Sequence, residues 1–147
     1  MKKFYSISLL FLLCFMLQAK AQTDNSGLRF VDANGKVIED GATIKSNNAI
    51  NDPYVENGKM ISEHLFLDNS QKKDFTIYVK YTINNIEGTS LGVCFGEECT
   101  QEEEAGTYKI DNMPILANDE NKPELKVEFA FETKGKASVT VQIFYQS

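Results

Sequence analysis

Alternation of apolar and polar side chains, repeated along several stretches, is the feature that most constrains how this chain can fold. In FTIYVKYTINNI, residues 75–86, the odd positions from Phe75 to Ile83 are apolar or aromatic and the even positions are mostly polar. A β-strand places successive side chains on opposite faces, so such a stretch presents one face to a core and the other to solvent. Its β-branched and aromatic residues also favour extended structure. The pattern predicts a long strand.

Two further stretches repeat this pattern, and six shorter ones show part of it. LKVEFAFET (125–133) and SVTVQIFY (138–145) predict long strands. The shorter candidates are residues 28–32, 36–39, 42–45, 62–69, 91–95 and 107–111. Helical periodicity is almost missing after residue 21, so the pattern predicts an all-β protein.

Turn-forming residues separate most of the candidate strands. Asn34 and Gly35 predict a two-residue hairpin loop, and TKGKA (133–137) is short enough to join the last two long strands as an antiparallel hairpin. Other turn pairs are Asp40-Gly41, Asn57-Gly58, Asn69-Ser70 and Glu87-Gly88. Residues 46–59 are polar and predict a long loop. Eight or nine strands with frequent turns predict an antiparallel immunoglobulin-like β-sandwich, one domain over residues 28–147.

The first 21 residues have the composition of a secretory signal peptide. Lys2 and Lys3 form a basic start, about 11 apolar residues follow, and Ala19 and Ala21 provide a small-x-small ending. The apolar stretch is too short to cross about 30 Å of hydrocarbon as a helix. We expect cleavage after Ala21, a flexible leader over residues 22–27, and an exported product in the periplasm or outside the cell.

The charge of the expected product is strongly acidic. Removal of 21 residues that hold three lysines and no acid leaves 126 residues with a net charge of −9, against −6 for the whole chain. Such a chain repels phosphate backbones and anionic lipid. Nucleic acid is therefore not an expected partner, and no membrane insertion is expected after cleavage.

Cys94 and Cys99 are the two cysteines of the expected product, within GVCFGEEC. An even cysteine count in an exported chain indicates a disulfide. The C-x4-C spacing differs from the C-x-x-C of thioredoxin-like redox sites, and two thiols with the single histidine, His64, fall short of a four-ligand zinc site. The turn Phe95-Gly96-Glu97-Glu98 between them is either a stapled turn alone or a stapled loop that presents Phe95 and the acids to a partner.

Metal binding and catalysis find little support in the sequence. The acids Glu97, Glu98, Glu102, Glu103 and Glu104 lack the spacing of a calcium loop, so a solvated acidic loop is the expectation. His64 lies in a predicted strand beside Leu65 and Leu67 of the alternate face, as a surface histidine would. No nucleophile elbow or phosphate loop is present. We expect no enzyme activity, no metal and no cofactor.

The order LRFVDANGKVIEDGATI, LDNS, YVKYTI, GVCFGEEC and VTVQIFY resembles small exported proteins of Bacteroidetes-type bacteria. These are immunoglobulin-like β-sandwiches with a CFG-x-x-C hairpin, and the resemblance covers most of residues 28–147. It implies a disulfide between Cys94 and Cys99 and adds little on mechanism. The chain departs from the group at LDNS, where Asp68 replaces a basic or neutral residue.

Together these patterns predict an exported, non-enzymatic module for recognition or scaffolding at the bacterial cell envelope. It would act through loops at one end of the sandwich or through an exposed edge strand, on an unidentified protein or glycan, with a monomer as the expected state. The site expected to bind is Phe95 as an apolar anchor with Gly96, Glu97 and Glu98 around it. The alternatives are a surface-fibre subunit that assembles by strand exchange, and a small secreted hydrolase or inhibitor with a shallow site.

Overall fold

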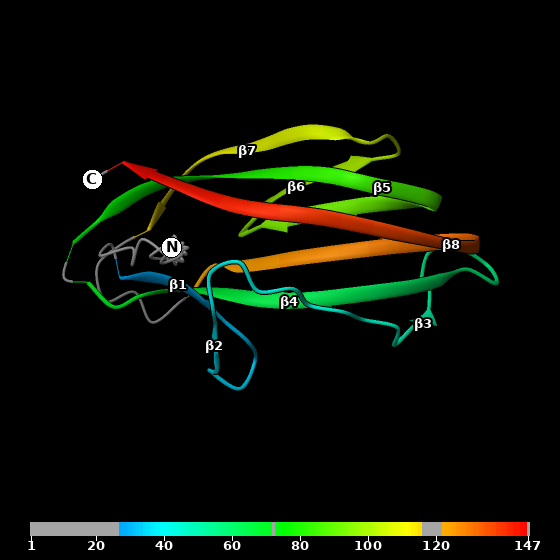
Figure 1. Ribbon diagram of the computed structural model, residues 1–147, viewed down its shortest axis with the longest axis horizontal. Coiled ribbons are helices and arrows are strands. Elements are labelled where there is room, and N and C mark those ends of the chain that lie inside the picture. The colour runs from blue at the N-terminus through cyan, green and yellow to red at the C-terminus, as the bar shows by residue number, and fades with distance from the viewer. Residues whose placement is uncertain (1–26, 72, 116–121, 147) are drawn as a thin grey trace, which may run out of the picture.

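The computed structural model describes residues 27–71, 73–115 and 122–146, so the expected signal peptide and nearly all of the expected leader lie outside it. Its eight strands are β1 (Leu28–Val31), β2 (Val37–Ile38), β3 (Ile50–Asn51), β4 (Lys59–Asn69), β5 (Phe75–Phe95), β6 (Glu98–Glu102), β7 (Gly106–Ile115) and β8 (Glu124–Gln146). Every strand pair is antiparallel. The predicted all-β antiparallel sandwich is confirmed (Figure 1).

The two layers of the sandwich share strands β5 and β8. The hydrogen-bonded order is β2-β1-β4-β8-β5-β6, with β3 beside β4 and β7 beside β5. Residues 125–131 of β8 pair with 89–95 of β5 in the first layer, and residues 137–146 of β8 pair with 76–86 of β5 in the second. Figure 1 shows β8 running along one layer in orange, turning at one end of the molecule and returning along the other in red.

The corner of β8 corrects the prediction that TKGKA closes a hairpin. The two halves of β8 do not pair with each other, because β4 and β5 occupy both sides of the first half. Strand β5 bends with β8 at Gly88, where φ is 62°, so Glu87-Gly88 is a bend within one strand and not a reversal. At Gly135 an added Cβ would lie 1.7 Å from the Glu87 carbonyl oxygen, so only glycine allows this close approach.

The N-terminal segments match the prediction in part. The β1–β2 hairpin forms, but Asp32 N donates to Lys36 O (2.9 Å), which leaves a three-residue loop that ends at Gly35 with φ of 78°. Residues 42–45 form no strand and are exposed, so that prediction is wrong. Their one large apolar side chain, Ile44, is 45% exposed and buries too little area to hold the segment on a sheet.

The core lies between the layers and is built from the alternating residues that the sequence indicated. Phe75, Ile77, Val79, Tyr81 and Ile83 are at most 5% exposed. They pack with Leu91, Val93, Phe95, Leu125 and Val127 from the first layer. No helix in the described part of the chain is long and apolar enough to cross a bilayer.

Candidate functional site

The β5–β6 hairpin carries the disulfide that the sequence predicted. Cys94 and Cys99 are direct cross-strand partners with their Cα atoms 4.0 Å apart, and their sulfur atoms are 2.09 Å apart. Gly96 takes the left-handed conformation (φ 60°) in the turn, and its N–H donates to the Glu124 carbonyl oxygen at 2.9 Å. The turn is therefore held by a covalent bond on one side and by β8 on the other.

Phe95 does not fit the binding role that the sequence suggested. Its side chain is 1% exposed and lies in the core, because its position in the alternation of β5 matches Leu91 and Val93. The prediction that Phe95 is a surface anchor is wrong for this conformation. Gly96, Glu97 and Glu98 are exposed, so binding at this turn stays a prediction that lacks its apolar anchor.

The acidic run beyond the hairpin contributes one contact between the layers. Tyr81 in the second layer is buried, and its hydroxyl lies 2.7 Å from Thr100 Oγ1 and donates to Glu102 Oε1 at 3.3 Å. Burial raises the pKa of the Tyr81 hydroxyl, and the charge of Glu102 raises it further. Within the described ranges, no group of three or more His, Cys, Asp or Glu residues could hold a metal ion.

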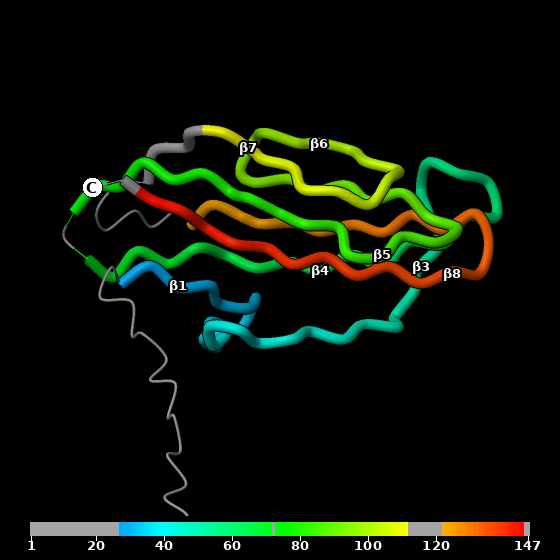
Figure 2. Tube along the Cα trace, turned by 45° about the horizontal axis from the view of Figure 1, so that its top comes forward, coloured from blue at the N-terminus to red at the C-terminus, as the bar shows by residue number. Residues whose placement is uncertain are grey.

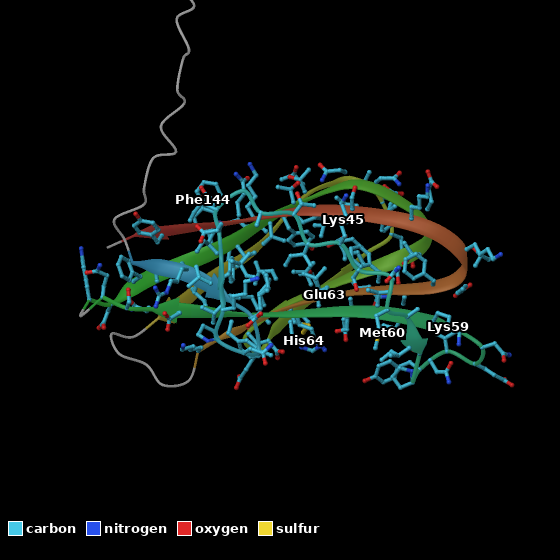
Figure 3. All side chains as sticks on the ribbon, turned by 60° about the horizontal axis from the view of Figure 1, so that its bottom comes forward. Lys45, Lys59, Met60, Glu63, His64 and Phe144 are labelled. Atoms are coloured by element: carbon cyan, nitrogen blue, oxygen red, sulfur yellow. A yellow bond between two sulfur atoms is a disulfide. The ribbon has the colours of Figure 1, made fainter. Side chains whose placement is uncertain are left out.

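A Ser–His–Glu chain on the outer face of the first layer is the constellation that the sequence did not reveal. Ser62 Oγ lies 2.9 Å from His64 Nε2, and His64 Nδ1 lies 2.5 Å from Glu124 Oε1. Glu63 and His64 project to opposite sides of β4 (Figure 3). The i, i+2 spacing of Ser62 and His64 was visible in the sequence, but the contact with Glu124 depends on the β4–β8 register.

The contacts from Ser62 through His64 to Glu124 follow the nucleophile–base–acid order of a hydrolase triad. They lack the enclosed site that such a triad needs. Ser62 also donates to Glu128 Oε1 at 3.3 Å, so its hydroxyl proton is not directed to His64 alone. The side chains of His64 and Glu124 are 45% and 40% exposed on an open sheet face. Acyl transfer needs a water-excluding site with donors aimed at the oxyanion, and an open face does not provide one. The arrangement is a surface polar network.

A second polar cluster fixes the end of β4. Asp68 Oδ1 accepts from Lys122 Nζ and Asp68 Oδ2 from Arg29 Nε, both at 2.8 Å. Lys122 and, to a smaller extent, Arg29 hold the pKa of Asp68 below its usual value against the opposing effect of burial. The cluster ties β1 and the chain before β8 to β4, which is a structural role.

The C-terminal half of β8 differs from these sites because it offers an open backbone. We call residues 137–144 the edge segment. β5 pairs with one side of it, and no backbone hydrogen bond within residues 27–71, 73–115 and 122–146 reaches the other side. The edge segment, ASVTVQIF, contains no charged residue and no proline. Val139, Val141 and Ile143 face the core and are only partly buried.

The other edges of the described sheet are short or charged. β6 begins at Glu98 and ends at Glu102, β7 carries Lys109 and Asp111, and β2 has two residues. Charged or short edge strands protect a monomer from unwanted pairing with other chains. The edge segment lacks both forms of protection.

An aromatic ladder on the outer face of the second layer leads to this edge. The Tyr78 and Phe144 rings are direct cross-strand partners and stack with their centroids 5.0 Å apart at an interplanar angle of 6°. Lys109 Nζ lies 4.5 Å from the Tyr78 ring centroid. Phe144 is the last member of the ladder, projects from β8 (Figure 3), and is 37% exposed. Phe144 faces outward because it alternates with the inward Val141 and Ile143, but its position at an edge depends on topology.

Comparison with known proteins identifies the fold and no family. No protein-family model matches the sequence, and no curated protein matches it. Among solved structures, the N-terminal domain of PorA matches with a TM-score of 0.59 at 13% identity, over 80% of this chain and 82% of that chain. The chain therefore shares its fold with that domain. The resemblance to small exported Bacteroidetes-type proteins is supported as to fold and disulfide, and membership of that group stays a prediction.

Proposed function

We propose that this protein is an exported, non-enzymatic recognition module of the bacterial cell envelope, which binds an extended polypeptide segment by strand addition to the edge segment of β8. The observation that carries this proposal is the uncharged edge, open along residues 137–144 in the described structure. An added strand pairs its backbone with such an edge, and its alternate side chains contact the two faces.

The chemistry of the edge segment supports stable strand addition. Each backbone hydrogen bond to an added strand contributes about 0.5–1.5 kcal/mol net. The partly buried Val139, Val141 and Ile143 would lose further contact with water, at about 25 cal/mol per Å² of apolar surface. Several such contributions along eight residues are enough for specific binding.

Two further observations support export and the absence of catalysis as parts of the proposal. The N-terminal sequence has the pattern of a signal peptide, and the Cys94–Cys99 disulfide suits an oxidising compartment outside the cytoplasm. The Ser62–His64–Glu124 chain lies on an open face that does not stabilise an oxyanion. Strand addition by a donor strand of another subunit would make the protein a fibre component, which is the second candidate and uses the same edge.

Site-specific photo-crosslinking in the intact envelope tests the proposal. A benzophenone amino acid is placed at Gln142 on the edge segment or, as the matched control, at Gln101, an exposed glutamine on the charged edge strand β6. We expect an adduct from position 142 that maps to one contiguous segment of a partner, and none at that segment from position 101.

A blocking variant decides whether the backbone edge is used. Val141→Lys places an inward-pointing charge on the edge, a device that prevents strand pairing, while its flexible stem lets the ammonium reach solvent. Val141→Thr is the control for the loss of valine. We expect the adduct to disappear in Val141→Lys and to persist in Val141→Thr, with both variants folded by circular dichroism. An undiminished adduct in Val141→Lys would rule out strand addition.

A further inference from the structure

We infer that the partner contributes a single extended strand, with apolar residues at alternate positions facing inward and an aromatic residue opposite Phe144. This inference rests on the proposed function and specifies the occupant of the edge. It follows from the unequal width of the two layers and from the aromatic ladder.

The first layer extends further than the second on the side of the edge segment. Beyond residues 124–131 of β8 the first layer continues with β4, β1 and β2, whereas among the described residues the second layer ends at the edge segment. Figure 2 shows β1 and the chain that follows it beyond β4, on the side away from β7. Strands β1 and β4 contribute to the same core as the edge segment, through Leu28, Phe30, Leu65 and Leu67.

This geometry favours one added strand over an added domain. A strand beside the edge segment continues the second layer over the inner side of β4 and β1, where Leu65 and Phe30 are only partly buried. A folded partner that offered its own sheet edge would bring a second layer with it, and that layer would meet β1 and β2. A single segment has no second layer and avoids this collision.

The inward positions of the added strand require apolar side chains. They would lie beside Val139, Val141 and Ile143, and the edge segment itself has no charge that could pair with one placed there. Burying an unpaired charge costs far more than strand addition gains. The partner segment therefore has apolar residues beside Val139, Val141 and Ile143. Glu63, which faces inward from β4 opposite Val127, is the acid with which a basic residue of the partner would pair.

The outward position opposite Phe144 favours an aromatic residue. Tyr78 covers one face of the Phe144 ring, and the other face points toward the open side of β8, because the two rings stack across the strands. Aromatic pairs in offset-stacked geometry contribute about 0.5–1.5 kcal/mol beyond their buried area. An aromatic residue of the partner would extend the ladder from Tyr78 through Phe144.

The chain itself supplies a probe of this chemistry. FTIYVKYTI, a copy of residues 75–83, already pairs with β8 from the other side and places Tyr78 opposite Phe144. We expect a fluorescent peptide with this sequence to bind the folded protein in an anisotropy titration. Replacing its first tyrosine by serine should weaken binding about fivefold, from the loss of one stacking interaction.

Backbone methylation separates strand addition from non-specific adhesion. A strand uses the N–H groups on one of its two sides, which alternate along the sequence. Two peptides are made. One carries N-methyl groups on its odd-numbered residues and the other on its even-numbered residues. We expect one of them to bind as tightly as the unmodified peptide and the other to lose binding. Equal behaviour of the two would overturn the inference.

Variants of the protein locate the binding site. Phe144→Ser should weaken binding of the peptide about fivefold, by the same loss of stacking. Tyr54→Ser is the control, because Tyr54 is an aromatic residue 89% exposed on a loop, and it should leave binding unchanged. If no peptide binds while Gln142 still crosslinks to the edge of a folded domain, the single-strand inference is wrong and the proposed function survives. If neither binding nor crosslinking occurs, both fail.

Discussion

The two halves of β8 have opposite compositions for their positions in the sheet. Residues 124–131, the central segment, have a neighbouring strand on each side and contain Glu124, Lys126 and Glu128. The edge segment, residues 137–144, has one described neighbour and no charge. Soluble proteins commonly place charges on their edges. The proposed strand addition accounts for an uncharged edge, which solubility alone does not require.

The charges of the central segment are compatible with its position because they face outward. Lys126 Nζ lies 3.2 Å from Glu128 Oε2, and Glu124 contacts His64 on β4. The inward residues of the same segment, Leu125 and Val127, are 1% and 8% exposed. Its stability thus comes from its inner face, whereas the edge segment has a less buried inner face and no described strand on its second side.

The largest expected difference between the halves is in core packing. Leu125→Ala should lower the free energy of unfolding by about 2–5 kcal/mol, because it leaves a cavity in a fully buried site. Ile143→Ala removes a similar volume from a partly buried site and should cost about 1–2 kcal/mol. Urea denaturation of both variants measures the difference. Equal losses would mean that the edge segment is as well packed as the central one.

The second expected effect concerns the stapled hairpin, whose first strand lies beside the central segment. Replacing Cys94 and Cys99 together by serine should lower the free energy of unfolding by about 2 kcal/mol, since the closed loop is short. Amide exchange should rise in β6 and stay unchanged in the edge segment. Faster exchange throughout residues 137–144 would show that the hairpin also supports the second layer.

Much of this fold could be predicted from residue alternation, and the parts that could not depend on pairing. The alternation along β5 identified its buried residues, and the cysteine count identified the disulfide. The residue pattern does not indicate that β5 and β8 cross between layers, because Gly88 and Gly135 are equally typical of hairpin turns. Which strand has an open edge depends on that topology.

The expected surface position of Phe95 is wrong for a related reason, whereas binding at Gly96, Glu97 and Glu98 stays a prediction. Phe95 belongs both to the candidate strand 91–95 and to the expected turn, and the period of two that buries Leu91 and Val93 continues through it. The alternation was visible in the sequence and would have placed the ring in the core. Phe144 faced outward by the same rule, and only the strand order shows that it lies at an edge.

Low pH should weaken the ion pairs of Asp68 in the first layer, which holds the central segment. Asp68 has a lowered pKa in the folded protein, so its contribution to stability is present above its ordinary value of 3.8 and is lost as pH falls through the folded value. Asp68→Asn should cost about 1 kcal/mol or less at neutral pH, because Arg29 and Lys122 are half-exposed.

The pH dependence separates this cluster from the edge. Denaturation between pH 2 and pH 6 should show that the difference between wild type and Asp68→Asn shrinks toward the acid end. Binding of the FTIYVKYTI peptide at pH 6 should be the same for both proteins, since the cluster lies on the outer face of the first layer. Weaker peptide binding by Asp68→Asn would show that the Asp68 cluster influences the edge segment.

The smallest expected effect is also the most specific test of register at the edge. Gln142 lies opposite Lys80 on β5, two residues from the Tyr78–Phe144 pair. If the peptide FTIYVKYTI adds with its first tyrosine opposite Phe144, its lysine lies opposite Gln142 on the open side. Gln142→Glu should then strengthen peptide binding about two- to fivefold at low salt, because opposite charges on neighbouring strands attract by about 0.2–1 kcal/mol.

The same substitution should leave stability within about 0.5 kcal/mol of wild type, as expected for an exposed position. High salt should remove the gain in binding, because exposed charge pairs are screened. Gln101→Glu on β6 serves as the control and should leave binding unchanged. A gain that persists in high salt, or that also occurs with Gln101→Glu, would place the peptide elsewhere on the surface. A gain confined to position 142 ties the peptide to one side and one register of the edge segment.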